Sequence, residues 1–357
     1  MDDIARRKGE HLRLAATDDA VARSGPGFDD VRLVHRALPE VDFERLDPSV
    51  ELLGHRLRLP LVVASMTGGH PDGAAINATL ARVVEEHGLA MGVGSQRAAL
   101  RDPSLAETYR IARREAPTAL LMANVGAAQL VAQRDESPLT PGDVARLAEM
   151  IGADAVIVHL NALQELIQPE GDRNGAGWLE AIGGLVRELS VPVVAKETGG
   201  GLSEADARRL AEAGVAAIDV GGRGGTSFAA IEGIRAAERG DARGVALAGI
   251  FAEWGIPTAA SVVVAARAGV PVIATGGVRS GLDAARALAL GAVAVGVARP
   301  LLQAARAGDD EVAAWIGRFR DELLGAMFLT GSATAADVRR APYVLGGETE
   351  SWVRGLG

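Results

Sequence analysis

From about residue 59, hydrophobic and polar positions follow one repeating order along the chain. A stretch with helical periodicity leads to a glycine, a short apolar run follows, and a cluster of small polar residues ends the unit. The segments "EMIGADAVIVHLN", "AEAGVAAIDVGG" and "LALGAVAVGVA" show this order. An apolar run without alternation is typical of a parallel strand that is covered on both faces. The pattern therefore predicts helices that alternate with parallel strands.

Eight apolar runs qualify as strands of this kind. They are "LPLVVASM", "GLAMGVGS", "TALLMANVG", "ADAVIV", "SVPVVAKE", "VAAIDV", "VPVIAT" and "AVAVGVA". Eight βα units over roughly 250 residues fit a (β/α)8 TIM barrel of the α/β class, which we place at residues 59–308. An open, doubly wound sheet is the structural alternative, but its dinucleotide-binding form needs a GxGxxG after the first strand, which this sequence lacks. The glycines that end five helical stretches should adopt left-handed caps; they are Gly88, Gly152, Gly214, Gly269 and Gly291.

Two segments flank the predicted barrel. Residues 1–58 contain a basic, helix-like start and the strand-like pieces "DVRLVHRAL" and "VELLGHRLRL", so we expect an N-terminal extension packed on the barrel. Residues 309–330 predict a final amphipathic helix, and the remaining residues to 357 predict an irregular tail. No low-complexity linker divides the chain, which favours one domain over residues 1–357.

Composition narrows the function. The net charge of −9 and the pI of about 5.3 argue against a nucleic-acid surface. The absence of cysteine excludes disulfides, iron–sulfur clusters, thiolate zinc sites and cysteine nucleophiles. The N-terminus lacks an apolar signal region, and no run reaches the ~18 apolar residues of a membrane-spanning helix. These features predict a cytoplasmic protein that does not associate with a membrane.

Lysine is rare in a chain that is rich in arginine. Of the 37 Lys and Arg residues, only Lys8 and Lys196 are lysines. An ammonium group is a compact point charge, whereas a guanidinium is a planar fork, so retention of lysine at two positions suggests a need for that point charge. The alternative is chance placement.

Polar residues gather where the predicted strands end, and this edge carries the active site in barrels of this kind. The first three strands lead to Ser65, Met66, Thr67, Ser95, Gln96, Arg97 and Asn124. The fourth leads to His159, Asn161, Gln164 and Glu165, and the fifth to Lys196. The last three lead to glycine-rich turns with Thr226, Gly276, Gly277, Arg279, Ala298 and Arg299.

The turns after strands seven and eight favour a phosphate site. Glycine-rich turns at these two positions present backbone N–H groups and a helix N-terminus to an anion. Arg279 and Arg299 would add charge-assisted hydrogen bonds. The alternative is that the glycines only permit tight turns.

The fourth and fifth strand ends leave several interpretations open. Glu165 has the chemistry of a Mg²⁺ ligand that shares the ion with substrate phosphates, or of an ordinary exposed carboxylate. His159 alone is compatible with a core histidine. Lys196 is compatible with a buried ion pair, a Schiff-base lysine or a cation beside a cofactor ring.

The motifs "RRKGEHL", "SMTGGH", "GVGSQR", "HLNALQELIQPEGDRN", "VAKETGGG", "TGGVRSGLDAARALALGA" and "MFLTG" resemble type 2 isopentenyl-diphosphate isomerases from about Arg7 to the tail. The resemblance implies a flavin-dependent barrel that interconverts isopentenyl and dimethylallyl diphosphate, a step of isoprenoid biosynthesis. It implies FMN, Mg²⁺ and a reductant such as NADPH as cofactors, and a homo-oligomer. The segment "SFAAIEGIRAAE" varies among such proteins and is treated as peripheral.

The resemblance also implies roles for single residues. FMN would contact Ser65, Met66, Thr67, Ser95, Asn124, Lys196, Thr226, Gly276, Gly277, Arg279, Ala298 and Arg299. The prenyl diphosphate would contact Arg7, Lys8, His11, Ser95, Gln96, Arg97, His159, Asn161 and Gln164. Gln164, Lys196 and Glu165 would be the catalytic residues, with Glu165 on Mg²⁺. The implied chemistry is a proton shift in which reduced FMN acts as acid and base, with Lys196 favouring the anionic ring.

Three other functions remain as alternatives. An FMN-dependent 2-hydroxyacid oxidase or dehydrogenase needs a histidine base late in the barrel, and the last histidine here is His159. A Schiff-base aldolase would use Lys196 but would not need Ser65, Thr67 or Asn124. A non-catalytic flavin- or prenyl-phosphate-binding protein would not need Gln164 and Glu165.

Overall fold

The computed structural model describes residues 3–134 and 136–356, and its centre is a closed barrel of eight parallel strands. The strands are β4 (Leu61–Val63), β5 (Ala90–Gly92), β6 (Leu120–Gly126), β7 (Ala155–Leu160), β8 (Val193–Glu197), β9 (Ala217–Asp219), β10 (Val272–Thr275) and β11 (Ala294–Val297). Each strand pairs with its neighbour in the chain, and β11 pairs with β4 to close the ring. All eight predicted strands and the predicted (β/α)8 barrel are confirmed.

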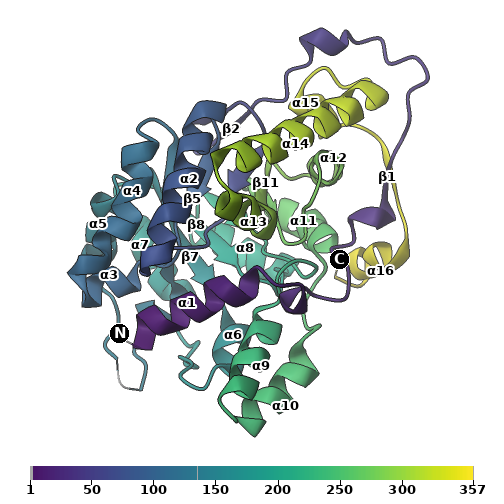
Figure 1. The fold of residues 1–357 in the computed structure, drawn as a ribbon. Coiled ribbons are helices and arrows are strands. Elements are labelled where there is room, and N and C mark those ends of the chain that lie inside the picture. The colour runs from purple at the N-terminus through teal and green to yellow at the C-terminus, as the bar shows by residue number, and fades with distance from the viewer. Residues whose placement is uncertain (1–2, 135, 357) are drawn as a thin grey trace.

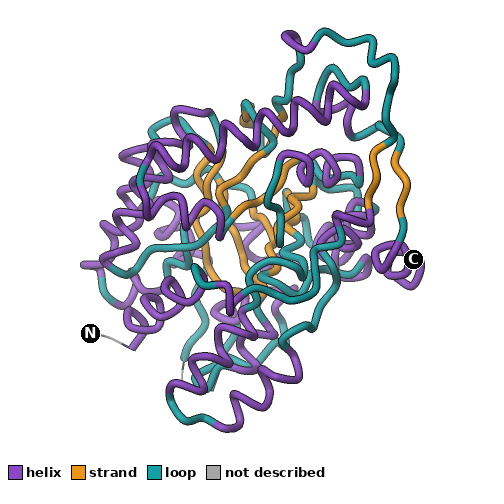
Figure 2. Tube along the Cα trace, turned by 45° about the vertical axis from the view of Figure 1, so that its right-hand side comes forward, coloured by secondary structure: helices purple, strands orange, loops and turns teal. Residues whose placement is uncertain are grey.

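A ring of helices surrounds the strands, which Figure 2 shows in purple around the orange strands. The helices that lead from one barrel strand towards the next are α2 (Pro71–His87), α4 (Glu107–Glu115), α5 (Pro141–Met150), α7 (Trp178–Glu188), α8 (Glu204–Glu212), α11 (Thr258–Ala266), α12 (Gly281–Ala289) and α13 (Arg299–Ala307). Additional helices follow β5, β7 and β9; they are α3 (Arg97–Arg101), α6 (Ala162–Ile167), α9 (Phe228–Glu238) and α10 (Ala242–Phe251). The five predicted glycine caps all have positive φ, between 55° and 114°.

Two hydrophobic clusters hold the layers together. The larger cluster fills the space between the barrel and its helices, and Leu61, Leu121 and Ile218 are among its fully buried members. A smaller cluster fills the inside of the barrel, where Met122 and Ile157 belong to it. Small residues such as alanine supply much of both clusters, which lets helices approach the strands closely.

The N-terminal extension caps both ends of the barrel. The hairpin of β2 (Val50–Leu52) and β3 (His55–Leu57) contributes Leu52 and Leu57 to the cluster inside the barrel, so it closes the amino-terminal end of the strands. Helix α1 (Asp3–Ala15) lies at the opposite end, where Arg7, His11 and Ala15 line the main cavity. Figure 1 shows α1, in purple, crossing the molecule between the α2–α3 side and α9.

The C-terminal segment corrects one prediction. Helix α14 (Asp309–Thr330) has the bounds expected for the amphipathic helix, but the residues after it do not form an irregular tail. They form α15 (Ala335–Val338), β12 (Tyr343–Leu345) and α16 (Gly347–Leu356), and β12 pairs antiparallel with β1 (Val31–Leu33). This order depends on a partner strand roughly 300 residues away in the chain, which local sequence patterns do not reveal.

Short 3-10 turns complete the described chain; they are η1 (Asp18–Ala20), η2 (Phe28–Asp30), η3 (Phe43–Arg45), η4 (Pro103–Ala106) and η5 (Ala127–Leu130). Within residues 3–134 and 136–356, no helix combines the length and the apolar character needed to cross a lipid bilayer.

Candidate active site

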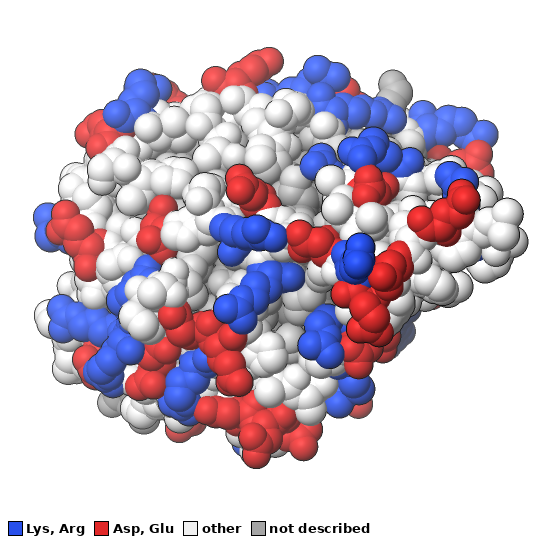
Figure 3. Space-filling view, turned by 90° about the horizontal axis from the view of Figure 1, so that it is seen from above, with Lys and Arg blue, Asp and Glu red and all other residues white. Residues whose placement is uncertain are grey.

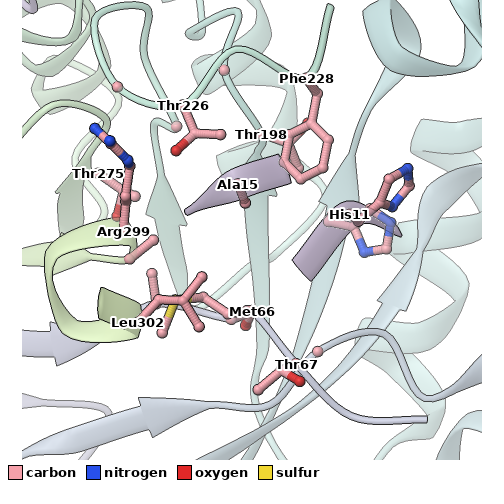
Figure 4. Close-up of a pocket in the computed structure, with 18 of the residues that line it drawn as sticks. His11, Ala15, Met66, Thr67, Thr198, Thr226, Phe228, Thr275, Arg299 and Leu302 are labelled. Carbon is pink, nitrogen blue, oxygen red and sulfur yellow. The ribbon is translucent and has the colours of Figure 1, made fainter. Parts of the chain in front are cut away.

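A cavity of about 520 Å³ lies at the carboxyl ends of the barrel strands and beneath α1. Its wall contains every predicted site residue except Gln96. Figure 4 shows its opposite sides, with Arg299 and Thr275 facing one part of the cavity and His11 the other, and with Met66 and Leu302 along one edge. The carboxyl ends of parallel strands converge on one face, and this convergence explains why residues so far apart in the sequence meet here.

Gln96 is the exception, and its predicted contact with substrate is corrected. The residue is fully buried, and its side chain donates to the carbonyl of Leu147 and accepts from the backbone N–H of Asn124, each at 2.9 Å. It therefore supports β6 behind the wall of the cavity. The adjacent Ser95 and Arg97 do line the cavity.

The turns after β9 and β10 form one cradle of backbone. Gly276 and Gly277 have φ values of 115° and 75°, which favour glycine. A Cβ on Gly276 would lie 2.2 Å from the carbonyl oxygen of Gly222, and one on Gly277 would lie 2.5 Å from that of Gly224. Both positions therefore require glycine, and the two turns pack directly on each other.

The first turn of α13 lies beside this cradle. Its N-cap residue, Ala298, provides no side-chain hydrogen bond to the helix, so the N-terminal end of α13 keeps its affinity for an anion. Arg299 lines the cavity and forms an ion pair with the exposed Asp18 of η1. The arrangement has the features of a phosphate site.

Ser65 lines the cavity just beyond β4, the strand that pairs with β11. Its buried hydroxyl oxygen has no hydrogen-bond partner among the residues that the structure describes. A Cβ on Gly92 would lie 2.3 Å from this oxygen, so the glycine keeps the space that the hydroxyl occupies. An unpartnered buried hydroxyl on a cavity wall is suited to a polar ligand.

His159 and Asn124 form a polar pair at the ends of β7 and β6. The imidazole Nδ1 lies 2.7 Å from Asn124 Oδ1. Since an amide oxygen only accepts, Nδ1 carries the proton. Burial, together with the charges of Lys196 and Lys8, lowers the pKa of His159 to about 4. The imidazole is therefore neutral at physiological pH, and its Nε2 offers a lone pair.

Glu165 is held at the start of α6 by two hydrogen bonds. Its carboxylate accepts from Asn161 Nδ2 at 2.7 Å and from the backbone N–H of Asp172 at 2.8 Å. Burial raises the pKa of Glu165 in spite of these bonds. Beside it, the buried Oδ1 of Asn161 has no hydrogen-bond partner in the described part of the chain. Across residues 3–134 and 136–356, no group of three His, Cys, Asp or Glu side chains is placed to hold a metal ion.

Gln164 is oriented by Glu232, a residue that our sequence analysis treated as peripheral. One oxygen of Glu232 accepts from Gln164 Nε2 at 3.0 Å and lies 2.8 Å from His11 Nε2, and the other pairs with the fully buried Arg235. Burial alone would raise the pKa of Glu232, but the bond to His11 and the charge of Arg235 outweigh it and hold the pKa at about 2. The sequence held one signal of this role, because Glu232 is a charged residue in the otherwise small and apolar run "SFAAIEG".

The two lysines occupy different environments. Lys8 Nζ donates to the carbonyls of Gly68 and Ser95 and to Tyr109 Oη at 2.6 Å. Burial, and then the charge of Arg7, lowers the pKa of Lys8 to about 7. Lys196 is buried at the end of β8 and pairs with Asp219 Oδ2 at 2.9 Å. Tyr109 and Asp219 were both missed by the sequence analysis.

Arg97 lies at the rim of the cavity. It forms ion pairs with Glu136 and, at 3.0 Å, with Asp172. Its guanidinium is mostly buried, so it is ordered before any ligand binds. With Arg7 and Lys8, it adds basic side chains to the wall of the cavity.

Comparisons with known proteins agree with this geometry. Residues 160–344 match the FMN-dependent dehydrogenase family. The chain is 51% identical over 346 residues to the isopentenyl-diphosphate delta-isomerase of Methanoregula boonei, covering 96% of this chain and 94% of that protein. It is 48% identical to the protein of the same name from Methanosarcina barkeri, covering 97% of this chain and 93% of that one.

The fold also resembles a solved structure of mandelate oxidase with benzoyl-formic acid, with a TM-score of 0.61, 22% identity and 96% of each chain covered. At that identity the likeness concerns the fold alone. The identities near 50% over almost the full length decide the family. The chain therefore belongs to the isopentenyl-diphosphate delta-isomerase family, on the barrel of the FMN-dependent dehydrogenases.

Proposed function

We propose that the chain interconverts isopentenyl diphosphate and dimethylallyl diphosphate with reduced FMN as cofactor and Mg²⁺ on the diphosphate. The observation that carries the proposal is the single cavity in which a phosphate cradle and the His159–Glu165 cluster face the same space. A flavin phosphate and a prenyl diphosphate need separate anion sites, and the cavity has positive groups at two places. Relatives at 46–51% identity carry the name of this isomerase.

The residues present fit FMN. The cradle of Gly276 and Gly277 beside the first turn of α13 suits the phosphate, and the unpartnered hydroxyl of Ser65 suits a polar edge of the ring system. When bound, reduced FMN supplies an acid/base group and an electron-rich ring beside the alkene. Lys196 would place its positive charge against that ring. Thr226 and Thr275 line the same part of the cavity.

One carboxylate and one free amide oxygen fit a Mg²⁺ ion that is shared with the substrate. Mg²⁺ is commonly held by one or two carboxylates, with phosphate oxygens and water as its other ligands. Glu165 and the unpartnered Oδ1 of Asn161 provide such a partial ligand set. The ion would contribute charge neutralisation at the diphosphate.

The chain itself holds the substrate and excludes water. Arg7, Lys8 and Arg97 would bind the diphosphate at the mouth of the cavity. Apolar side chains such as Met66, Phe228 and Leu302 would surround the isoprenoid tail. Glu232 fixes the amide of Gln164, so that this amide is directed by the protein before substrate arrives. A low-dielectric site with fixed dipoles stabilises charge that develops at the tertiary carbon.

Several broader features are proposed on the family resemblance of the motifs. These are NADPH as the reductant of the flavin and assembly as a homo-oligomer. A cytoplasmic location and a single domain over residues 1–357 are proposed on the N-terminal composition and on the lack of a low-complexity linker. The expectation that the chain does not bind nucleic acid rests on its net charge of −9 and on the face shown in Figure 3, where acidic and basic side chains are interspersed.

The test is an anaerobic incubation of the purified protein with FMN, dithionite, Mg²⁺ and isopentenyl diphosphate in D₂O, followed by NMR. We expect dimethylallyl diphosphate with incorporated deuterium. Product should be lost when the flavin is oxidised and when EDTA removes the metal. Product formed equally with oxidised flavin would contradict the acid/base role of reduced FMN. A protein that binds FMN but forms no product would contradict the isomerase assignment.

A further inference from the structure

Asp219 is a buried carboxylate to which the proposed function gives no role. It ends β9, its side chain is 7% exposed, and it does not line the cavity. Three groups that bind it, from Lys196, Thr275 and Gly221, belong to residues that do line the cavity. Asp219 therefore lies directly behind the wall of the site.

The carboxylate is fixed from three directions. Its Oδ2 accepts from Lys196 Nζ at 2.9 Å and from Thr275 Oγ1 at 3.0 Å, and its Oδ1 accepts from the backbone N–H of Gly221 at 3.1 Å. Lys196 and Asp219 are paired in register on neighbouring strands. Thr275 is confined in turn, because a Cβ on its register partner Gly296 would lie 1.9 Å from its hydroxyl oxygen.

Asp219 is also the carboxylate that neutralises Lys196 most directly. His159 faces Lys196 from β7, but an imidazole brings no negative charge. Glu197, the next residue on β8, directs its carboxylate to the backbone N–H groups of Gly199, Gly200 and Gly201. The ammonium of Lys8, on α1, adds only positive charge.

A buried ammonium without a carboxylate partner is unfavourable. The partner also holds a flexible side chain in one position. We propose that Asp219 is a positioning residue that holds the Lys196 side chain in place and directs it at the cofactor, and thereby sets how strongly the site favours reduced over oxidised FMN. The inference rests on the proposed function, since it requires FMN in the cavity.

The test compares the two-electron reduction potential of bound FMN in the wild type and in Asp219→Asn. Without its carboxylate partner, Lys196 should lose its fixed position beside the cofactor, and the reduced, anionic flavin should lose stabilisation. We expect at least a tenfold weaker preference for the reduced form, which corresponds to a fall of about 30 mV. An unchanged or higher potential would overturn the inference.

A double-mutant cycle separates this effect from a general disturbance of the barrel. Lys196→Met alone should lower the potential, and Asp219→Asn added to Lys196→Met should lower it no further. A second fall of equal size in the Lys196→Met background would show that Asp219 acts by another route, and would overturn the inference. Removal of both charges of the pair also avoids an unpaired buried charge, which favours folding of the double variant.

Two controls complete the experiment. If Asp219→Asn does not fold, Thr275→Val takes its place, because it removes one of the hydrogen bonds to Asp219 Oδ2. Thr275→Val should lower the potential by a smaller amount, and this fall should vanish in the Lys196→Met background. An unchanged potential in Thr275→Val would overturn the inference. A wild-type protein that binds no FMN would refute the proposed function and the inference with it. FMN binding with equal potentials in wild type and Asp219→Asn refutes the inference alone.

Discussion

Single residues at the cavity show how burial selects a protonation state. His159 stays neutral because it is buried beside cations, and Glu232 stays ionised because His11 and Arg235 compensate for its burial. In water at pH 5 a histidine is positively charged and a glutamate is negatively charged. In the folded protein, the protonation state of both is set by the same balance between the cost of burial and the charges of neighbouring groups. Each state has a measurable consequence for stability.

His159 should make the protein sensitive to acid. The folded state holds its pKa near 4, below the ordinary value of 6.5. Neutral His159 therefore contributes stability that is present above pH 6.5 and is lost as the pH falls towards 4, by on the order of 2–3 kcal/mol. In His159→Gln, urea unfolding at pH 6.5 and pH 4.5 should give free energies that differ less than in the wild type.

The matched control for this prediction is His35→Gln, because His35 is exposed on the segment after β1. It should keep the wild-type dependence on pH. Equal acid sensitivity in His159→Gln and wild type would mean that other groups carry the whole effect.

At the residue scale, the sequence predicted most of the residues that line the cavity but few of the residues that hold them in place. Residues at strand ends were predicted because the fold places all of those ends on one face. Gln96 was misplaced because its neighbours Ser95 and Arg97 point into the cavity while it turns back onto β6. Asp219, Glu232 and Tyr109 were missed because their roles depend on partners from distant segments, which residue spacing does not encode.

Among the elements, α1 and α9 are joined by buried charge rather than by apolar contact alone. Arg235 of α9 is 1% exposed and pairs with Glu10 of α1, with Glu170 after α6, and with Glu232. Glu232 in turn binds His11 of α1. Gln168 joins the same network when its amide is turned so that the nitrogen faces Glu232, to which it then donates, and the oxygen faces Arg7, from which it then accepts. The helix over the cavity is thus tied to the element that orients Gln164.

Loss of Arg235 should be costly. Arg235→Met leaves Glu232, which is fully buried, without its main cation. Breaking one partner out of a buried pair costs about 3–5 kcal/mol. We expect a fall of that size in the free energy of unfolding, measured with urea at pH 7.

Arg13→Met is the comparison for this variant. Arg13 of α1 pairs with Glu238 of α9 at the surface, where both side chains are about half exposed. A surface pair contributes at most about 1 kcal/mol, so this variant should change little. Similar losses in the two variants would mean that burial does not set the strength of the α1–α9 contact.

The sequence predicted elements well where their signal is local. Barrel strands were found from uninterrupted apolar runs, and α14 was found from its helical periodicity. The strand β12 was missed because it is short and mostly exposed, with Val344 at 60%, so it lacks the apolar pattern of a buried strand. Its order comes from pairing with β1, which is a tertiary effect.

At the scale of the whole molecule, the β2–β3 hairpin closes the amino-terminal end of the barrel. Leu52 and Leu57 are each 1% exposed and pack on interior residues of the strands. A barrel of eight strands is filled by side chains, so its open end needs apolar cover. The extension at residues 1–58 is therefore a part of the core as well as a cover for the cavity.

Leu57→Ala should destabilise the entire fold. Truncation of a buried leucine costs about 2–5 kcal/mol, because it removes apolar contact and leaves a void. The thermal midpoint should fall accordingly, and calorimetry would detect the shift. Leu38→Ala, at a side chain that is 78% exposed, should leave the midpoint nearly unchanged. Comparable shifts in both variants would contradict the conclusion that the hairpin packs into the core of the barrel.

The pairing of β1 with β12 has a consequence for biosynthesis. When β1 leaves the ribosome its partner has not been translated, and at typical elongation rates the wait is on the order of 15–60 s. All eight barrel strands are made during that interval, since they lie between the two in the chain. The barrel can therefore close before β1 has a partner, and the N-terminal segment gains this contact only after β12 has been translated.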